Sequence, residues 1–110
     1  MRVQISSRHT DISEDVMDRT REQMERLTRY DPDLRAADVV FDSAKRGKSV
    51  EAVLHIDREE PKVATGKADT YQGAVDQLVG RLGRMLRRGR DQRRDHQGPK
   101  LSETISVAEE

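Results

Sequence analysis

The sequence predicts an α+β domain in which a four-stranded sheet carries two helices packed on one of its faces. Four segments alternate apolar and polar residues as half-buried strands do, and two longer segments repeat apolar residues at helical spacing. Their order along the chain is β-α-β-β-β-α, and the 110 residues fit one domain of ordinary size. Two amphipathic helices and a sheet bury their apolar surfaces most economically when both helices cover one face and leave the other in solvent.

The first strand and the first helix are separated by a short polar segment. Residues 2–7 alternate apolar and polar side chains, as in a strand with one buried face. Ser13 is suited to cap the helix, because its hydroxyl can accept from free backbone N–H groups of the first turn. We expect this helix over residues 14–29, and Pro32 confirms the stop, since the residue before a proline is pushed out of the helical region.

Three more strands are predicted at residues 37–44, 49–57 and 62–68. The alternation is cleanest in the second of these, where every other residue is apolar. The first two are close enough to pair as a hairpin around Gly47, and a second turn at residues 58–61 leads to the last strand.

Asp69 or Thr70 can cap the second helix, which is expected to run to about residue 92. Its apolar stripe consists of Tyr71, Ala74, Val75, Leu78, Leu82 and Leu86. The glycines Gly80, Gly83 and Gly89 weaken it, each by about 1 kcal/mol relative to Ala, or alternatively allow a close backbone approach to a neighbour. We expect residues 1–95 to form the domain and residues 96–110 to form a mobile, partly acidic tail.

Acidic and basic residues number 21 each, but they are unevenly distributed along the chain. Residues 81–100 contain 8 Lys and Arg against 2 Asp, whereas residues 101–110 contain 3 Glu and no basic residue. A dense basic segment suits a polyanionic partner, because charge distribution governs association more than fold. It is equally consistent with a solvated helix end that uses Arg as its surface residue, so charge alone leaves both interpretations open.

Several classes of chemistry lack the residues that they need. The chain has no cysteine, which excludes a disulfide framework and a thiolate zinc site. The histidines, His9, His55 and His96, have no helical metal-binding spacing, and no serine lies in a nucleophile-elbow sequence. We therefore expect a protein that is not an enzyme, with no catalytic residue, no metal site, no cofactor and no small-molecule substrate.

The hydropathy pattern also indicates in which cellular compartment the protein is expected. No apolar segment approaches the roughly 20 residues that span a bilayer. The first residues lack the apolar core of a secretory signal. We expect no membrane partner, a cytoplasmic location and a monomer when the protein is free.

The second helix carries a stripe of arginines. Arg81, Arg84 and Arg88 are three and four residues apart and share one helix face, with Arg87 beside it. The planar guanidinium donates two parallel hydrogen bonds to phosphate, so a helix anchored by leucines makes this stripe a rigid phosphate-binding surface. Further basic candidates lie on the hairpin and strand ends, namely Lys45, Arg46, Lys67 and Arg8.

The small number of aromatic residues narrows the class of polyanionic partner that we expect. Tyr30, Phe41 and Tyr71 are the only ones, and the last two are expected in the core. Without a stacking platform for unpaired bases, binding should follow the shape and charge of a structured RNA, although DNA is possible by charge alone. The alternative is a small non-catalytic regulatory module that binds a protein partner through the solvated sheet face. That face would carry Arg2, Gln4, Arg8, Val40, Asp42, Glu51, Val53 and His55.

A series of short segments occurs in an order typical of one protein family. They are VQISSRH at 3–9, DIS at 11–13, VVF at 39–41, EAVLHI at 51–56, VATGK at 63–67 and DTY at 69–71. Together with the leucine and arginine pattern of the second helix, this series resembles the ribosome hibernation-promoting factor family over residues 2–95. No single segment is diagnostic, and the specificity lies in the ordered series. The resemblance implies the same β-α-β-β-β-α fold.

The resemblance also implies a function. Such a chain would bind the small ribosomal subunit and its rRNA in the channel where messenger and transfer RNA meet, and would block translation in resting or stressed cells. The rRNA contacts would be made by basic residues of the long helix and the hairpin, here Arg81, Arg84, Arg87, Arg88, Lys45, Arg46 and Lys67. The second domain of long family members, which pairs ribosomes, is not expected in this chain, although a shortened long member would have the same sequence pattern. This implies inactivation of single ribosomes or action beside a separate dimer-promoting factor.

Overall fold

The elements of the computed structural model follow the predicted order, β-α-β-β-β-α. The structure describes residues 1–97, so the predicted tail at residues 96–110 lies almost entirely outside the described residues. The elements are β1 (Arg2–Arg8), α1 (Glu14–Arg26), the 3-10 turn η1 (Leu27–Arg29), β2 (Leu34–Ala44), β3 (Gly47–Ile56), β4 (Lys62–Ala68) and α2 (Tyr71–Gln97). Together, α1 and η1 span the segment that was predicted as one helix.

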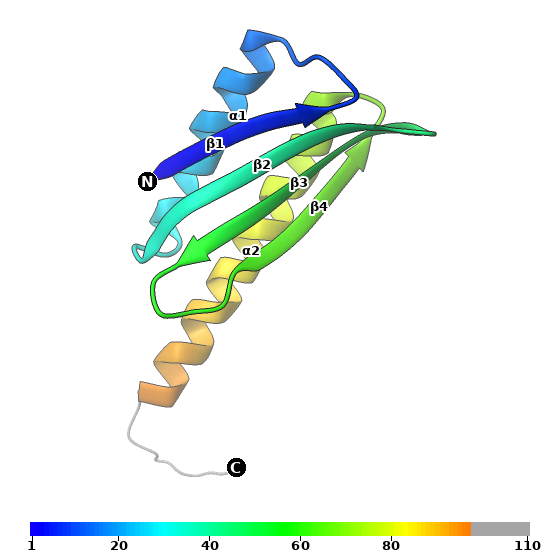
Figure 1. The fold of residues 1–110 in the computed structure, drawn as a ribbon. Helices are drawn as coiled ribbons and strands as arrows, with labels where there is room; N and C mark the ends of the chain where they lie inside the picture. The colour runs from blue at the N-terminus through cyan, green and yellow to red at the C-terminus, as the bar shows by residue number, and fades with distance from the viewer. Residues whose placement is uncertain (98–110) are drawn as a thin grey trace.

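The four strands form one mixed sheet in the order β1-β2-β3-β4 (Figure 1). β1 and β2 are parallel because the chain returns through α1 between them, whereas the two hairpins that follow are antiparallel. Val39 of β2 lies opposite Ile5 of β1 and Ala52 of β3. Since side chains alternate along each strand, this register gathers the apolar residues of all strands on one face.

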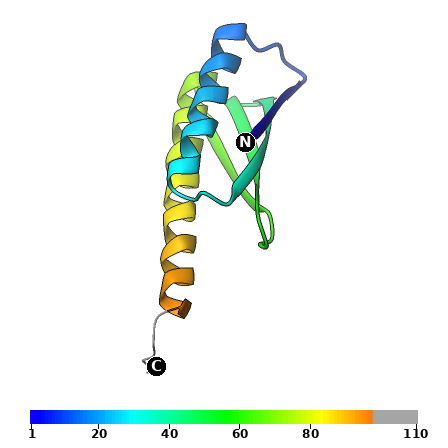
Figure 2. The same cartoon turned by 90° about the vertical axis from the view of Figure 1, so that its left-hand side faces the viewer.

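Both helices cover that apolar face and leave the other face of the sheet open, as predicted (Figure 2). The largest fully buried side chains between the layers are Phe41, Met24, Leu27, Leu54, Leu78, Leu82 and Leu86. Phe41 packs edge-on against Tyr71 at the start of α2, with ring centroids 5.5 Å apart. Within residues 1–97, none of the helices is long and apolar enough to cross a membrane.

Each helix begins at a capping hydroxyl. Ser13 Oγ accepts a hydrogen bond from the backbone N–H of Val16 at 3.3 Å, as predicted. For α2, the sequence left Asp69 and Thr70 open, and the structure assigns the cap to Thr70, whose Oγ1 accepts from the backbone N–H of Gly73 at 3.0 Å. Each cap satisfies a backbone donor that has no partner inside its helix.

Two element boundaries differ from the prediction by three residues or more. β2 begins at Leu34, three residues early, and its pairing is irregular between Leu34 and Ala36, which interrupts the alternation that marks a strand. α2 ends at Gln97, five residues beyond the predicted end. Gly89 and the charged residues after it do not stop the helix, because Arg and Gln are good helix formers. A highly polar sequence was therefore taken for a helix end.

α2 approaches β4 so closely that one strand position has no room for a side chain. A Cβ on Gly66 would collide with the carbonyl oxygen of Ala74 and lie 3.0 Å from the backbone nitrogen of Leu78. Glycine at this position lets the helix backbone rest directly on the strand. A Cβ on Gly83, by contrast, would meet the ring of Tyr30 at 3.5 Å, an ordinary contact distance. The close approach considered for the helix glycines is thus made by a glycine of β4.

Candidate nucleic-acid interface

α2 turns an apolar side to the sheet and a basic side to solvent. The buried side consists of Leu78, Leu82 and Leu86, which are 0%, 0% and 1% exposed. Between these leucines stand Arg81, Arg84 and Arg88, all exposed. Because the helix is held along the sheet by its leucines, the three arginines emerge from a fixed backbone, in the predicted stripe.

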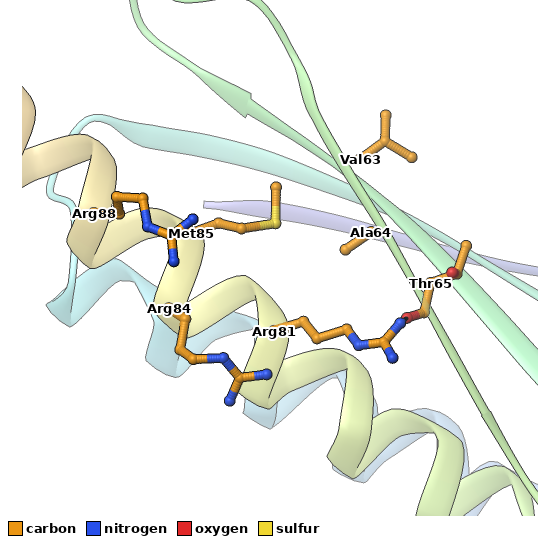
Figure 3. Close-up of a pocket in the computed structure, with 7 residues that line it drawn as sticks. All are labelled: Val63, Ala64, Thr65, Arg81, Arg84, Met85 and Arg88. Atoms are coloured by element: carbon orange, nitrogen blue, oxygen red, sulfur yellow. Dashed lines mark hydrogen bonds between the residues drawn. The ribbon is translucent and has the colours of Figure 1, made fainter.

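These arginines line a groove between α2 and β4, the last strand of the sheet (Figure 3). The groove has a volume of about 370 Å³ and is lined by Val63, Ala64, Thr65, Arg81, Arg84, Met85 and Arg88. Its cationic groups come from the helix and its apolar groups from both elements. A groove with this lining offers both charge and an apolar contact to whatever occupies it.

Arg81 is engaged within the molecule. Its Nη1 donates to the backbone carbonyl oxygen of Thr65 at 2.8 Å, across the groove (Figure 3). On the opposite edge of the sheet, Arg21 of α1 donates in the same way to the carbonyl oxygen of Val3 at 2.8 Å. Both edge strands therefore have a backbone acceptor covered by an arginine from a helix, which reduces the tendency of a sheet edge to pair with another chain.

Arg84 and Arg88 have no comparable partner among the residues whose side chains the structure describes. The ion pairs formed among the described residues join His9 to Asp42, Arg35 to Asp57, His55 to Asp38 and Lys62 to Glu59, and none involves an arginine of α2. No hydrogen bond within the described part of the chain uses the guanidinium of either residue. Their charges are therefore free to meet an external anion.

Arg87 takes a different direction from the stripe. Its guanidinium carbon lies 5.4 Å from the centre of the Tyr30 ring, which places it toward η1 rather than in the groove. A cation over an aromatic face is attracted by the negative charge of the π system. The sequence places Arg87 beside the stripe, but only the packing of Tyr30 on α2 determines which way its side chain goes.

The other predicted basic residues lie at the far end of the sheet, near the start of α2 (Figure 1). Lys45 and Arg46 are exposed in the hairpin turn, which closes at Gly47 with a φ of +111° that favours glycine. The register places Arg8 and Lys67 on the open face, at opposite ends of the row Arg8, Asp42, Ser49, Lys67. Together with Glu51, these residues line a shallow hollow of about 190 Å³.

The candidate residues thus form two regions rather than one surface. We call them the α2 groove (Arg81, Arg84, Arg88 and the other lining residues) and the hairpin end (Arg8, Lys45, Arg46 and Lys67). Thr65 lines both hollows, so β4 connects the two. In the hairpin end, Asp42 and Glu51 stand among the basic residues and offset part of their charge.

Two histidines have partners that sequence reasoning missed. His55 Nε2 lies 2.9 Å from Asp38 Oδ2, and His9 Nδ1 lies 3.4 Å from Asp42 Oδ1. His55 and Asp38 are diagonal neighbours on adjacent strands, so the pair becomes visible only once the strand register is known. Nowhere in residues 1–97 do three or more metal-ligating side chains gather.

Comparison with known proteins adds a family and a fold. The family model described as sigma 54 modulation protein / S30EA ribosomal protein matches residues 3–94. A ribosomal subunit interface protein from Coxiella burnetii superposes with a TM-score of 0.77 at 21% identity, covering 83% of this chain and 99% of that one. The N-terminal domain of Thermus thermophilus Protein Y superposes with a TM-score of 0.71 at 22% sequence identity, covering 81% of this chain and 99% of that one. No curated protein sequence matches the chain.

Proposed function

The chain belongs to the sigma 54 modulation protein / S30EA ribosomal protein family, and on that premise we propose that it is a ribosome-binding translation inhibitor. The family consists of ribosome-associated factors, a non-enzymatic kind of protein. The proposed site is the channel of the small subunit where messenger and transfer RNA meet, with contacts to rRNA. Occupation of that channel in resting or stressed cells would block translation. The proposal also includes a cytoplasmic location and a free protein that is monomeric.

One observation carries the proposed RNA contact. Arg84 and Arg88 are exposed, have no carboxylate partner among the described residues and project from a helix that is anchored by buried leucines. Such guanidiniums can bind phosphate oxygens without first breaking an internal ion pair. Since the helix backbone is already ordered, binding costs no backbone entropy, and the entropic cost is confined to the arginine side chains.

The placement of aromatic residues supports binding by shape and charge. Phe41 is buried, Tyr71 packs against it, and the ring of Tyr30 lies beneath Arg87. None of the three rings forms an exposed platform on which unpaired bases would stack. The proposed partner is therefore structured rRNA, recognised through its phosphates.

Salt dependence of ribosome binding tests this proposal. We expect the protein to co-sediment with small subunits, and the logarithm of its binding constant to fall with the logarithm of salt concentration. Contact with about six phosphates predicts a slope of roughly −4 to −5. Failure to co-sediment at low salt would contradict ribosome binding, and a nearly flat dependence would contradict the phosphate contacts.

A second candidate function is binding of a protein partner through the open sheet face. The observation that favours it is the exposed Val63, which lies beside Val53 on that face and is 52% exposed. A protein partner held by apolar contact predicts a much shallower salt dependence than rRNA does. The same titration therefore separates the two candidates.

A further inference from the structure

The two edges of the sheet differ in how far the helices cover them. At the β4 edge, Arg81 Nη1 donates to the carbonyl oxygen of Thr65 at 2.8 Å. Further along this strand, the backbone N–H of Lys67 donates to Gln77 Oε1 at 2.9 Å. Both side chains come from α2, so this helix satisfies a backbone acceptor and a backbone donor of β4 and closes its free edge.

At the β1 edge, the cover is confined to one carbonyl group. Arg21 Nη1 donates to the carbonyl oxygen of Val3 at 2.8 Å, so this carbonyl points away from β2. Because the backbone groups of alternate residues in a strand point to the same edge, those of Ile5 and Ser7 also point away from β2. No hydrogen bond from a side chain or a loop within residues 1–97 reaches them. β1, an outer strand of the sheet (Figure 1), therefore presents the N–H and the C=O of both residues as free donors and acceptors.

The surroundings of this edge leave room for another strand. A hollow of about 530 Å³ runs along β1, where it is lined by residues 3–6 and by Arg21 of α1. Ile5 is only half-buried, so a neighbouring strand would cover an apolar side chain as well as bond to the backbone. Residues 3–7 contain neither a charged residue nor a proline, which are common obstacles to pairing at a sheet edge.

The ends of β1 are positively charged. Arg2 and Arg8 are both exposed, and Arg21 adds a third guanidinium at the same edge. None of the ion pairs among the described residues includes any of the three. The two aspartates on the open face of β2, Asp38 and Asp42, each contact a histidine instead. A strand that pairs here is therefore favoured when it carries acidic residues.

We propose that the β1 edge binds an extended acidic segment of a partner protein, which joins the sheet antiparallel to β1. The segment exchanges backbone hydrogen bonds with Ile5 and Ser7, the mode of recognition known as strand addition. An apolar residue of the segment lies opposite Ile5. Acidic residues at its two ends, six positions apart, lie opposite Arg2 and Arg8 on the open face.

This site lies at the opposite edge of the sheet from the α2 groove. The inference goes beyond the proposed function and does not depend on it.

The same charges argue against pairing with a second copy. β1 contains no acidic residue, so two β1 strands side by side would bring the arginines of both copies together. Like charges directly opposite one another destabilise a strand pair. An acidic segment replaces this repulsion by attraction.

Binding of a designed peptide to the full-length protein tests the proposal. The peptide Glu-Ser-Thr-Val-Thr-Val-Glu, with both ends blocked, has an acidic residue at each end and a valine at its centre. At saturation in isotope-labelled protein, we expect it to slow hydrogen exchange of the Ile5 and Ser7 amides by about tenfold. The amides of Gln4 and Ser6 point toward β2 and should change little.

Three outcomes of this measurement would overturn the proposal. The first is slow exchange at Ile5 and Ser7 before the peptide is added, which would show that the edge is already paired. The second is unchanged exchange after the addition. The third is a set of changes centred on the α2 groove, which would assign the peptide to the arginines of α2.

Two N-methylated peptides separate strand addition from simple attraction of charge. In the antiparallel register, the fourth residue of the peptide points its N–H at β1, whereas the third residue points its N–H away. N-methylation of the fourth residue should weaken binding by about tenfold, because it removes the donor to the Ile5 carbonyl, and N-methylation of the third by no more than about threefold. Isothermal titration calorimetry measures both affinities, and equal losses would contradict the pairing.

Charge variants test the ends of the strand. Arg2→Glu with Arg8→Glu should weaken peptide binding by about tenfold, since it sets like charges opposite one another. The matched pair Lys45→Glu and Arg46→Glu makes the same charge change in the hairpin turn and should retain the affinity within about threefold. Equal weakening by the two pairs would show attraction to net charge only and would overturn the proposal.

A dispersed amide spectrum shows that each variant is folded. All of these measurements use the free protein, so a failure of ribosome binding leaves their outcome unchanged.

Discussion

The α2 groove and the hairpin end carry the same sign of charge but differ in how that charge is held. Arg84 and Arg88 stand on a helix fixed by buried leucines and have no acidic neighbour in the groove lining. Lys45 and Arg46 stand on a two-residue turn, and Arg8 and Lys67 share a hollow with Asp42 and Glu51. A count of basic residues does not distinguish the two regions. They differ in how firmly the backbone under the basic residues is held and in whether acidic side chains nearby offset the charge. The difference predicts that the groove dominates anion binding.

Removal of the support under the groove should have the largest effect. Leu82 is completely buried beneath the arginine stripe. Leu82→Ala should lower the free energy of unfolding by about 2–5 kcal/mol, because it removes buried apolar volume and leaves a cavity. Urea denaturation measures the loss. The control is Val63→Ala at an exposed position, expected to change stability by no more than about 0.5 kcal/mol, and similar losses in both variants would contradict the distinction.

Charge reversal in the groove should come next. Arg84→Glu with Arg88→Glu should abolish ribosome co-sedimentation at physiological salt, a loss of at least about tenfold in affinity, while the circular dichroism spectrum is preserved. The matched pair Arg19→Glu and Arg26→Glu makes the same charge change on α1 and should retain most binding. If the two pairs weaken binding equally, net charge rather than the groove determines affinity.

Arg81 should show a mainly structural effect. Because its guanidinium already donates to the carbonyl oxygen of Thr65, Arg81→Ala should lower stability by about 1 kcal/mol. Its effect on ribosome binding should be smaller than that of Arg84→Ala. Thermal melts and co-sedimentation of both single variants measure the two effects, and unchanged stability of Arg81→Ala would assign its role to the interface instead.

Charge reversal in the hairpin end should have the smallest effect. Lys45→Glu with Arg46→Glu changes exposed turn residues, and each exposed ion contact contributes only roughly 0.2–1 kcal/mol. We expect binding weaker by about threefold and an unchanged melting temperature. A loss as great as that of the groove pair would reverse the comparison and place the main contact at the hairpin end.

Much of the fold was predictable because local and tertiary preferences agree. Alternation identified all four strands, helical spacing identified both helices, and the capping role of Ser13 was confirmed. The start of β2 was missed because an irregular pairing at Leu34 breaks the alternation. The end of α2 was missed because charged residues continue a helix as readily as they end one.

The candidate site was predictable in composition but not in geometry. Spacing placed Arg81, Arg84 and Arg88 on one face, yet it gave no sign that Arg81 would reach Thr65 or that Arg87 would turn to Tyr30. Those contacts depend on which strand lies beside the helix and on side-chain rotamers, neither of which a residue pattern encodes. The division of basic residues into two regions likewise followed only from the strand order.

The absence of a side chain at Gly66 has a consequence for the whole binding surface. Gly66 sets the spacing between α2 and β4, because no side-chain carbon separates the two backbones at this position. A single methyl group at this point would lift the helix and widen the channel along which the guanidiniums stand. The arginines can be exchanged one at a time with local results, but a change at the smallest residue of β4 would displace all of them together.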